Sequence, residues 1–174
     1  MKKVYSILSI MLASLLFLSA CGDSKNSSVS VADEFSDYEE GIAPLYDRSL
    51  KLIEMSGHFT TIVEQPEQAY NYLRDEILPY VEESKKIAED LQGSLENREL
   101  KDLNEISLKQ FDLMLESFSK QAEVMKLNIP PMSDEEFNQS QDIYMEVVEL
   151  EEQIDQVIEE YNAKYDELEE KYGE

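Results

Sequence analysis

Residues 133–171, SDEEFNQSQDIYMEVVELEEQIDQVIEEYNAKYDELEEK, set the architecture that the rest of the chain has to fit. Ser133 with Glu136 three residues later is a capping-box pattern for a helix start. Apolar side chains then recur at the spacing of one helix face. They are Ile143, Val147, Leu150, Ile154, Val157, Tyr161, Tyr165, Leu168 and Tyr172. We expect one helix from Asp134 to about Lys171, roughly 57 Å long if unbroken.

A first amphipathic segment is expected from about Asp33 to Val63. Phe, Tyr, Leu and Ile side chains recur there with helical spacing. Gly41 and Pro44 interrupt the pattern early, because proline removes a backbone donor and clashes with the preceding turn. The sequence therefore leaves open one kinked helix or a short helix followed by a longer one.

Two more helical segments lie between these. One begins at Pro66, a good first-turn residue, and runs to about Leu91, with a kink at Pro79 and Gly93 as its C-cap. The other runs from its N-cap, Asn97, to Leu127. Two consecutive prolines in 128–131 then end the helix.

Short loops between long amphipathic helices favour antiparallel neighbours. The fold class predicted is therefore all-α: an elongated three- or four-helix antiparallel bundle of coiled-coil character. Glycine and proline are scarce, with five of each in 174 residues, and they fall where helices break. We assign residues 33–174 to this single acidic helical domain.

The start of the chain has a different character. Lys2 and Lys3 precede an uncharged, mostly apolar run from 4 to 20, which is shorter than a comfortable membrane span. A positive start, an apolar run and small residues make a secretory signal, so residues 1–20 are predicted to be a signal peptide. Two alternatives stay open. One is an ordinary signal peptide that Cys21 follows by chance, and the other is an apolar run that is not cleaved and stays in the membrane as a helix. Residues 21–32 form a short stretch of mostly small and polar residues, which suits a flexible tether.

Leu18-Ser19-Ala20-Cys21 resembles the lipobox of bacterial lipoproteins. The resemblance implies cleavage before Cys21 and a diacylglyceryl group, with fatty acyl chains such as palmitate, on its thiol. Two acyl chains give a stable anchor. With the tail from Glu151 to Tyr172 and its Ile-x-x-Val-Ile-Glu-Glu-Tyr-Asn run at 154–162, the chain resembles the family of cell-wall-binding lipoproteins of Gram-positive bacteria.

Charge excludes one large class of partners. The chain from Cys21 onward has 13 basic against 39 acidic residues, a formal charge of −26. Such a charge repels phosphate backbones, and no basic stripe exists to neutralise them, so nucleic acid is not an expected partner. Cys21 is the only cysteine, so no disulfide is expected either.

No local motif names a reaction. His58, the only histidine, lies four residues after Glu54, a spacing that metal sites can use. Di-iron bundles need Glu-x-x-His on two helices, which this chain lacks. We expect no catalytic residue, cofactor or metal, and we interpret His58 as a surface residue near a helix end. A metal-dependent envelope hydrolase built on Glu54 and His58 is kept as an alternative.

The stretch 132–163 contains 11 acidic residues and neither Lys nor Arg. We interpret this stretch as a solvent-exposed helix face, because runs of charged residues usually lie in contact with water. The alternatives are a docking face for a basic partner and loose binding of divalent cations. The tyrosines of this region are interpreted as packing residues, with stacking on wall sugars as the alternative.

The sequence thus predicts a non-enzymatic lipoprotein held on the outer face of the cell membrane by Cys21. One of its helical faces would bind a cell-wall component or a protein, and a basic protein is one such partner. The alternatives from other classes are the hydrolase and a self-assembling coiled-coil structural protein that pairs through its last helix.

Overall fold

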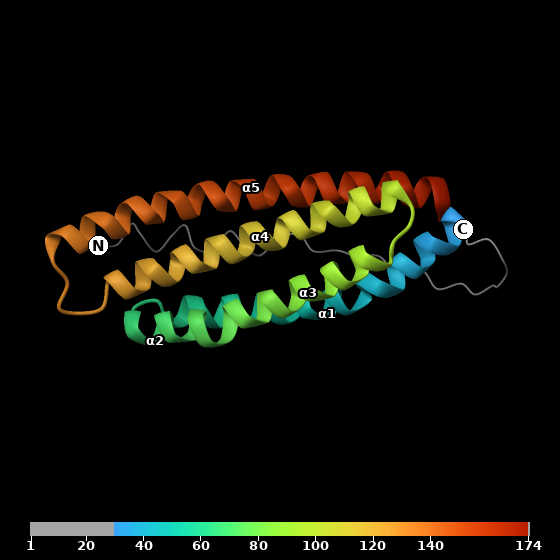
Figure 1. Ribbon diagram of the computed structural model, residues 1–174. Coiled ribbons are helices and arrows are strands. Elements are labelled where there is room, and N and C mark those ends of the chain that lie inside the picture. The colour runs from blue at the N-terminus through green and yellow to red at the C-terminus, as the bar shows by residue number, and fades with distance from the viewer. Residues whose placement is uncertain (1–29, 174) are drawn as a thin grey trace.

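The computed structural model describes residues 30–173, and every regular element in that range is a helix. The elements are α1 (Val31–Ile62), α2 (Pro66–Tyr72), the π-helix η2 (Leu73–Ile77), α3 (Leu78–Ser94), α4 (Arg98–Leu127) and α5 (Asp134–Tyr172). α2, η2 and α3 follow one another without a loop and act as one arm. α1, the arm from α2 to α3, α4 and α5 run antiparallel along one axis, with the start of α1 and the end of α5 at the same end (Figure 1). This confirms the predicted all-α bundle.

The last helix forms as the sequence predicts. Ser133 Oγ accepts a hydrogen bond from the Glu136 N–H, and Glu136 accepts in turn from the Ser133 N–H at 2.7 Å. This capping box satisfies backbone donors that a helix start leaves free. α5 then runs unbroken for 39 residues, and its apolar face is buried from Ile143 to Leu168.

The first helix is a single one, which settles the alternative left open at Pro44. Pro44 lies inside α1, which begins at Val31 rather than at Asp33. A second capping box starts it, with the Ser30 hydroxyl accepting from the Asp33 N–H at 3.1 Å. Val31 and Ala32 are therefore helical, and the predicted tether extended two residues too far.

Two glycines behave differently from expectation. Gly41 lies within α1, where an added Cβ would be 2.6 Å from Leu91 Cδ1, so the missing side chain lets α1 and α3 approach closely. Gly93 is not a C-cap, because α3 continues to Ser94 and no described glycine has a positive φ. The chain leaves the helix at Leu95 in an extended conformation, which buries that leucine at 4% exposure.

The irregularity expected at Pro79 falls one turn earlier. η2 is a stretch of π-helix in which the Leu78 N–H donates to the Leu73 carbonyl, five residues back. Pro79 follows near the start of α3, and it has no N–H with which to close an α-helical bond to residue 75. The wider turn before Pro79 keeps the arm continuous while Leu73 and Ile77 stay fully buried.

The interior has two apolar clusters, one toward each end. Phe59 of α1, Leu73 of η2 and Phe118 of α4 belong to the cluster near α2. Tyr38 of α1 and Leu103 of α4 belong to the other, together with the buried tyrosines of α5. α3 packs on α1 and α4, and α4 packs on α5, whereas α1 and α5 come close over a much shorter stretch. The side of the bundle between α1 and α5 is therefore the one along which neighbouring helices contact each other least.

Arg48 joins α1 to the α3 arm. Its Nε donates to Ser84 Oγ at 2.6 Å and its Nη2 donates to the Tyr80 carbonyl at 2.8 Å. The guanidinium also lies 4.0 Å from the centroid of the Tyr80 ring, within cation–π range. Its side chain is 22% exposed, so these bonds are largely shielded from water.

We expect Arg48→Ala to lower the free energy of unfolding by about 1.5–3 kcal/mol, the usual worth of hydrogen bonds from a charged group. Arg98→Ala is the matched control, because the Arg98 side chain is 93% exposed and, among residues 30–173, forms an ion pair only with Asp102, at 4.0 Å. Arg98→Ala is expected to lower the free energy of unfolding by less than about 1 kcal/mol. Urea denaturation followed by circular dichroism measures both, and equal costs would contradict the role assigned to Arg48.

Candidate functional site

The predicted signal peptide and Cys21 lie outside the described residues. Cys21 precedes Ser30 by nine residues, which span at most about 32 Å when extended. α1 begins at the end of the bundle where α5 finishes (Figure 1), so Cys21 precedes that end of the bundle in the sequence. Within 30–173, no helix combines the length and the apolar character that crossing a bilayer requires.

The structure does not give Glu54 and His58 further metal ligands. Glu54 Oε2 accepts a hydrogen bond from Lys51 Nζ at 2.9 Å, and its side chain is 71% exposed. The His58 ring packs edge-on against Tyr72, with 4.9 Å between ring centroids. Over residues 30–173, no group of three or more His, Cys, Asp or Glu side chains is placed to hold a metal ion.

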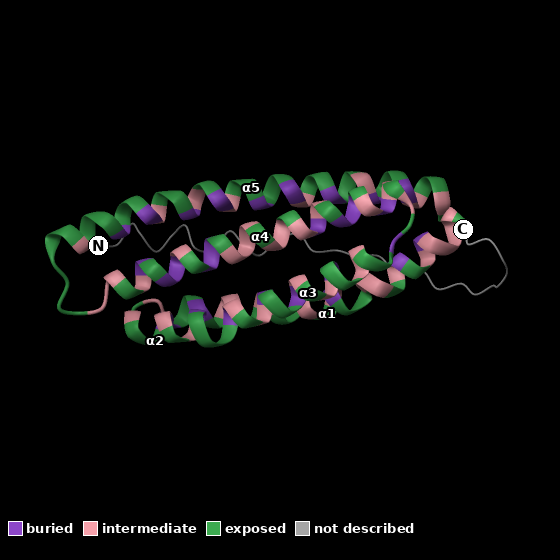
Figure 2. Ribbon diagram, in the orientation of Figure 1, coloured by how far each residue is buried: buried purple, intermediate pink, exposed green. Residues whose placement is uncertain are grey.

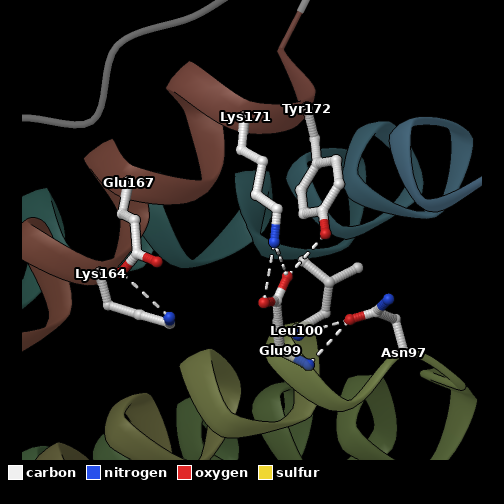
Figure 3. A network of polar contacts seen from close by, with 7 residues as sticks. All are labelled: Asn97, Glu99, Leu100, Lys164, Glu167, Lys171 and Tyr172. Atoms are coloured by element: carbon white, nitrogen blue, oxygen red, sulfur yellow. Dashed lines mark hydrogen bonds and ion pairs between the residues drawn. The ribbon is translucent and has the colours of Figure 1, made fainter.

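The end of the bundle nearest residue 30 is tied together by charged groups (Figure 3). Glu99 of α4 accepts hydrogen bonds from Tyr172 Oη at 2.6 Å and from Lys171 Nζ at 2.9 Å, both at the end of α5. These two donors hold the pKa of the Glu99 carboxyl below its usual value, with Tyr172 the larger cause. Glu34 of α1 accepts from the Asn97 N–H at 2.8 Å, so three arms meet here.

Two of the predicted packing tyrosines are buried next to this end. Tyr161 and Tyr38 share a hydrogen bond of 3.0 Å between their hydroxyls, and Tyr165 donates to Glu39 Oε1 at 2.6 Å. Burial raises the pKa of Tyr161 to about 12 and also raises the pKa of Tyr38 and of Tyr165. Tyr161 and Tyr165 therefore belong to the core, and they are not platforms for sugar rings.

The acidic stretch 132–163 faces mostly outward, as Figure 2 shows along α5. Two of its carboxylates reach lysines of α4, Glu146 with Lys120 and Glu160 with Lys109. In the part of the chain that the structure describes, the other acidic residues of this stretch form no ion pair. The predicted solvated face is thus present, and it remains unneutralised over most of its length.

One acidic residue of this stretch, Glu151, turns toward the interior. It lines a small recess with Phe59 of α1, Val124 and Met125 of α4, and Tyr144 of α5; Gln121 and Val147 complete the lining. Burial first, and then the nearby Asp155 carboxylate, raise the pKa of Glu151. Nothing in the sequence pattern distinguished Glu151 from its exposed neighbours, because the recess is formed with side chains of α1 and α4 that are far away in the sequence.

A second hollow opens at the far end of the bundle, of about 550 Å³. It lies between the start of α2 and the loop before α5, and its lining combines Pro66, Ile129 and Pro130 with the amides of Gln65, Gln68 and Asn71, and with Glu67. The hollow is broadly open to solvent and holds no buried charged group.

Comparisons of the chain with protein-family models, with curated proteins and with solved structures found no match.

Proposed function

We propose that this protein is a non-enzymatic lipoprotein, held on the outer face of the cell membrane by a lipid on Cys21, and that a helical face of it binds a protein or a cell-wall component. The observation that carries the proposal is the position of Cys21, the only cysteine, directly after Leu18-Ser19-Ala20 and a positively started apolar run. This feature of the sequence supports the proposed lipid anchor, and the length and charge of the bundle support the proposed binding.

The bundle supports the proposal through its shape. α5 is 39 residues long, about 58 Å at 1.5 Å per residue. With a flexible tether between Cys21 and α1, the long faces and the far loops stay within reach of partners outside the membrane.

Charge favours a basic protein among the proposed partners. The chain after the cleavage site has a formal charge of −26, from 13 basic and 39 acidic residues. Anionic wall polymers are repelled by such a surface unless divalent cations bridge the two, whereas a basic surface is attracted to it.

Photo-cross-linking in intact cells tests the proposed binding. A photoreactive residue is placed at one exposed position of each long arm, at Asp47, Asp90, Glu105 or Glu152. We expect a discrete adduct of higher mass from at least one arm, formed only on irradiation. Absence of any protein or wall adduct from all four positions would contradict the proposal.

A further inference from the structure

The hollow at the end of the bundle opposite the start of α1 has two unlike walls. One wall is the beginning of α2 with the residue before it, and the other is the loop between α4 and α5 (Figure 1). The volume of about 550 Å³ falls within the range of about 300–1,000 Å³ that is typical of ligand pockets. We call this place the far-end hollow, and residues 65–68, Asn71, Ile129 and Pro130 line it.

The α2 wall of the far-end hollow presents three carboxamides, those of Gln65, Gln68 and Asn71. None of these side chains forms a hydrogen bond with another residue in 30–173. Each carboxamide offers both a donor and an acceptor. A peptide group also offers one of each, so carboxamides at three-residue steps along a helix can pair with the main chain of an extended segment.

The loop wall of the far-end hollow is apolar and stiff. Ile129 and Pro130 line it, and a proline ring fixes φ, so little freedom is lost when a ligand packs against this loop. The chain continues to Met132 and Phe137, which are 43% and 46% exposed. They are two of the four large apolar side chains that are exposed in residues 30–173. Apolar side chains of a partner can therefore be buried at this end.

The charge at the far-end hollow is negative. Glu67 is the one charged residue in its lining, and it is exposed and forms no ion pair with another residue in 30–173. Glu64 precedes the α2 wall, and Asp134 and Glu135 follow the loop wall in the sequence. A Lys or Arg side chain of a ligand is attracted to such a site, whereas a carboxylate or a phosphate is repelled.

Other occupants fit the far-end hollow less well. Residues 21–29 span at most about 32 Å and join α1 at the opposite end, whereas α1 with its 32 residues is about 48 Å long. A second copy of this chain would bring its own carboxylates against Glu67. A sugar ring would find no aromatic face on which to stack, because no lining residue is aromatic.

We propose that the far-end hollow binds an extended, basic segment of a partner protein. The main chain of the segment pairs with the carboxamides of α2, an apolar side chain packs on Ile129 and Pro130, and a Lys or Arg lies beside Glu67. Main-chain hydrogen bonds supply affinity in this mode of recognition, and the side-chain contacts supply selectivity. This inference rests on the proposed function and names the class of partner and the place where it binds.

Peptide selection tests this proposal without a known ligand. Short random peptides displayed on phage are selected on the mature lipoprotein in nanodiscs of zwitterionic lipid. We expect the enriched peptides to combine Lys or Arg with an apolar residue. Fluorescence anisotropy of the most enriched peptide then measures its affinity for the wild type and for two pairs of variants.

The first pair of variants tests the place of binding, and the second tests the charge. Gln68→Trp fills the hollow and should weaken binding about tenfold or more, whereas Gln156→Trp, at an exposed position of α5 outside the lining, should change it less than about twofold. Glu67→Lys should weaken binding about fivefold. Glu152→Lys makes the same change in net charge at an exposed position of α5 and should weaken binding less than about twofold. Circular dichroism checks that each variant keeps its helix content.

Equal losses from Gln68→Trp and Gln156→Trp would overturn the proposal, because the peptide would then bind elsewhere. Equal losses from Glu67→Lys and Glu152→Lys would overturn it too, because binding would then depend on net charge alone. Selection that enriches no peptide, or binding of soluble cell-wall glycan fragments that only Gln68→Trp abolishes, would also overturn it. A cellular cross-link from one of the long arms, found together with any of these results, would leave the proposed function standing.

Discussion

Raising the pH from 10 to 12 should unfold the bundle cooperatively. The pKa of Tyr161 is raised from 10.0 to about 12, chiefly by burial, and the pKa values of Tyr38 and Tyr165 are raised as well. A group whose pKa is higher in the folded state contributes stability below its unfolded pKa and loses it as pH rises toward the folded one. For Tyr161 alone this loss is about 3 kcal/mol, against the roughly 5–15 kcal/mol of a typical domain.

The measurement is simple because the chain has no tryptophan, so near-ultraviolet absorbance reports tyrosinate directly. We expect helix loss and late tyrosine ionisation to coincide above pH 10. Tyr161→Phe should shift this transition to higher pH, because one ionisable group leaves the core. Tyr70→Phe, half-buried in the other cluster, is the control and should leave the transition in place. Full ionisation of every tyrosine near pH 10 with helix content retained would contradict this account.

Replacing Cys21 should abolish lipid attachment. In the proposed anchor the thiol forms the thioether to the diacylglyceryl group, which neither Ala nor Ser can form. We expect Cys21→Ala and Cys21→Ser to accumulate as precursor that stays in the membrane through its uncleaved apolar run. Metabolic labelling with palmitate, followed by electrophoresis of membrane fractions, measures both the label and the size.

Asp23→Ala is the matched control for this prediction, because it changes a residue two positions away without touching the thiol. It should be labelled and processed like the wild type. Mature-sized Cys21→Ala protein in the membrane fraction would show that the anchor is something other than a lipid on this cysteine.

Most of the helical architecture could be predicted because its determinants are local. The capping box at Ser133 and Glu136 and the apolar face of α5 depend on residues a few positions apart. The start of α1 depends on a local pattern too, since Ser30 and Asp33 form the same kind of box. The sequence interpretation missed it because small polar residues continue on the N-terminal side of Ser30.

The features that were missed depend on distances between helices. Gly41 looked like a break, yet it allows α1 to pass Leu91 of α3. Glu151 looked like one acid among 11, yet it lines a recess together with side chains of α1 and α4. Helical periodicity assigns a residue to a face of its own helix, but it does not say how closely the next helix approaches.

The mass of the N-terminal peptide of the protein extracted from cell membranes is the most direct test of the proposed anchor. We expect a peptide that begins at Cys21 and carries the added mass of a diacylglyceryl group. A peptide that runs through Ala20 into Cys21, or a mature chain with a free thiol at Cys21, would contradict it.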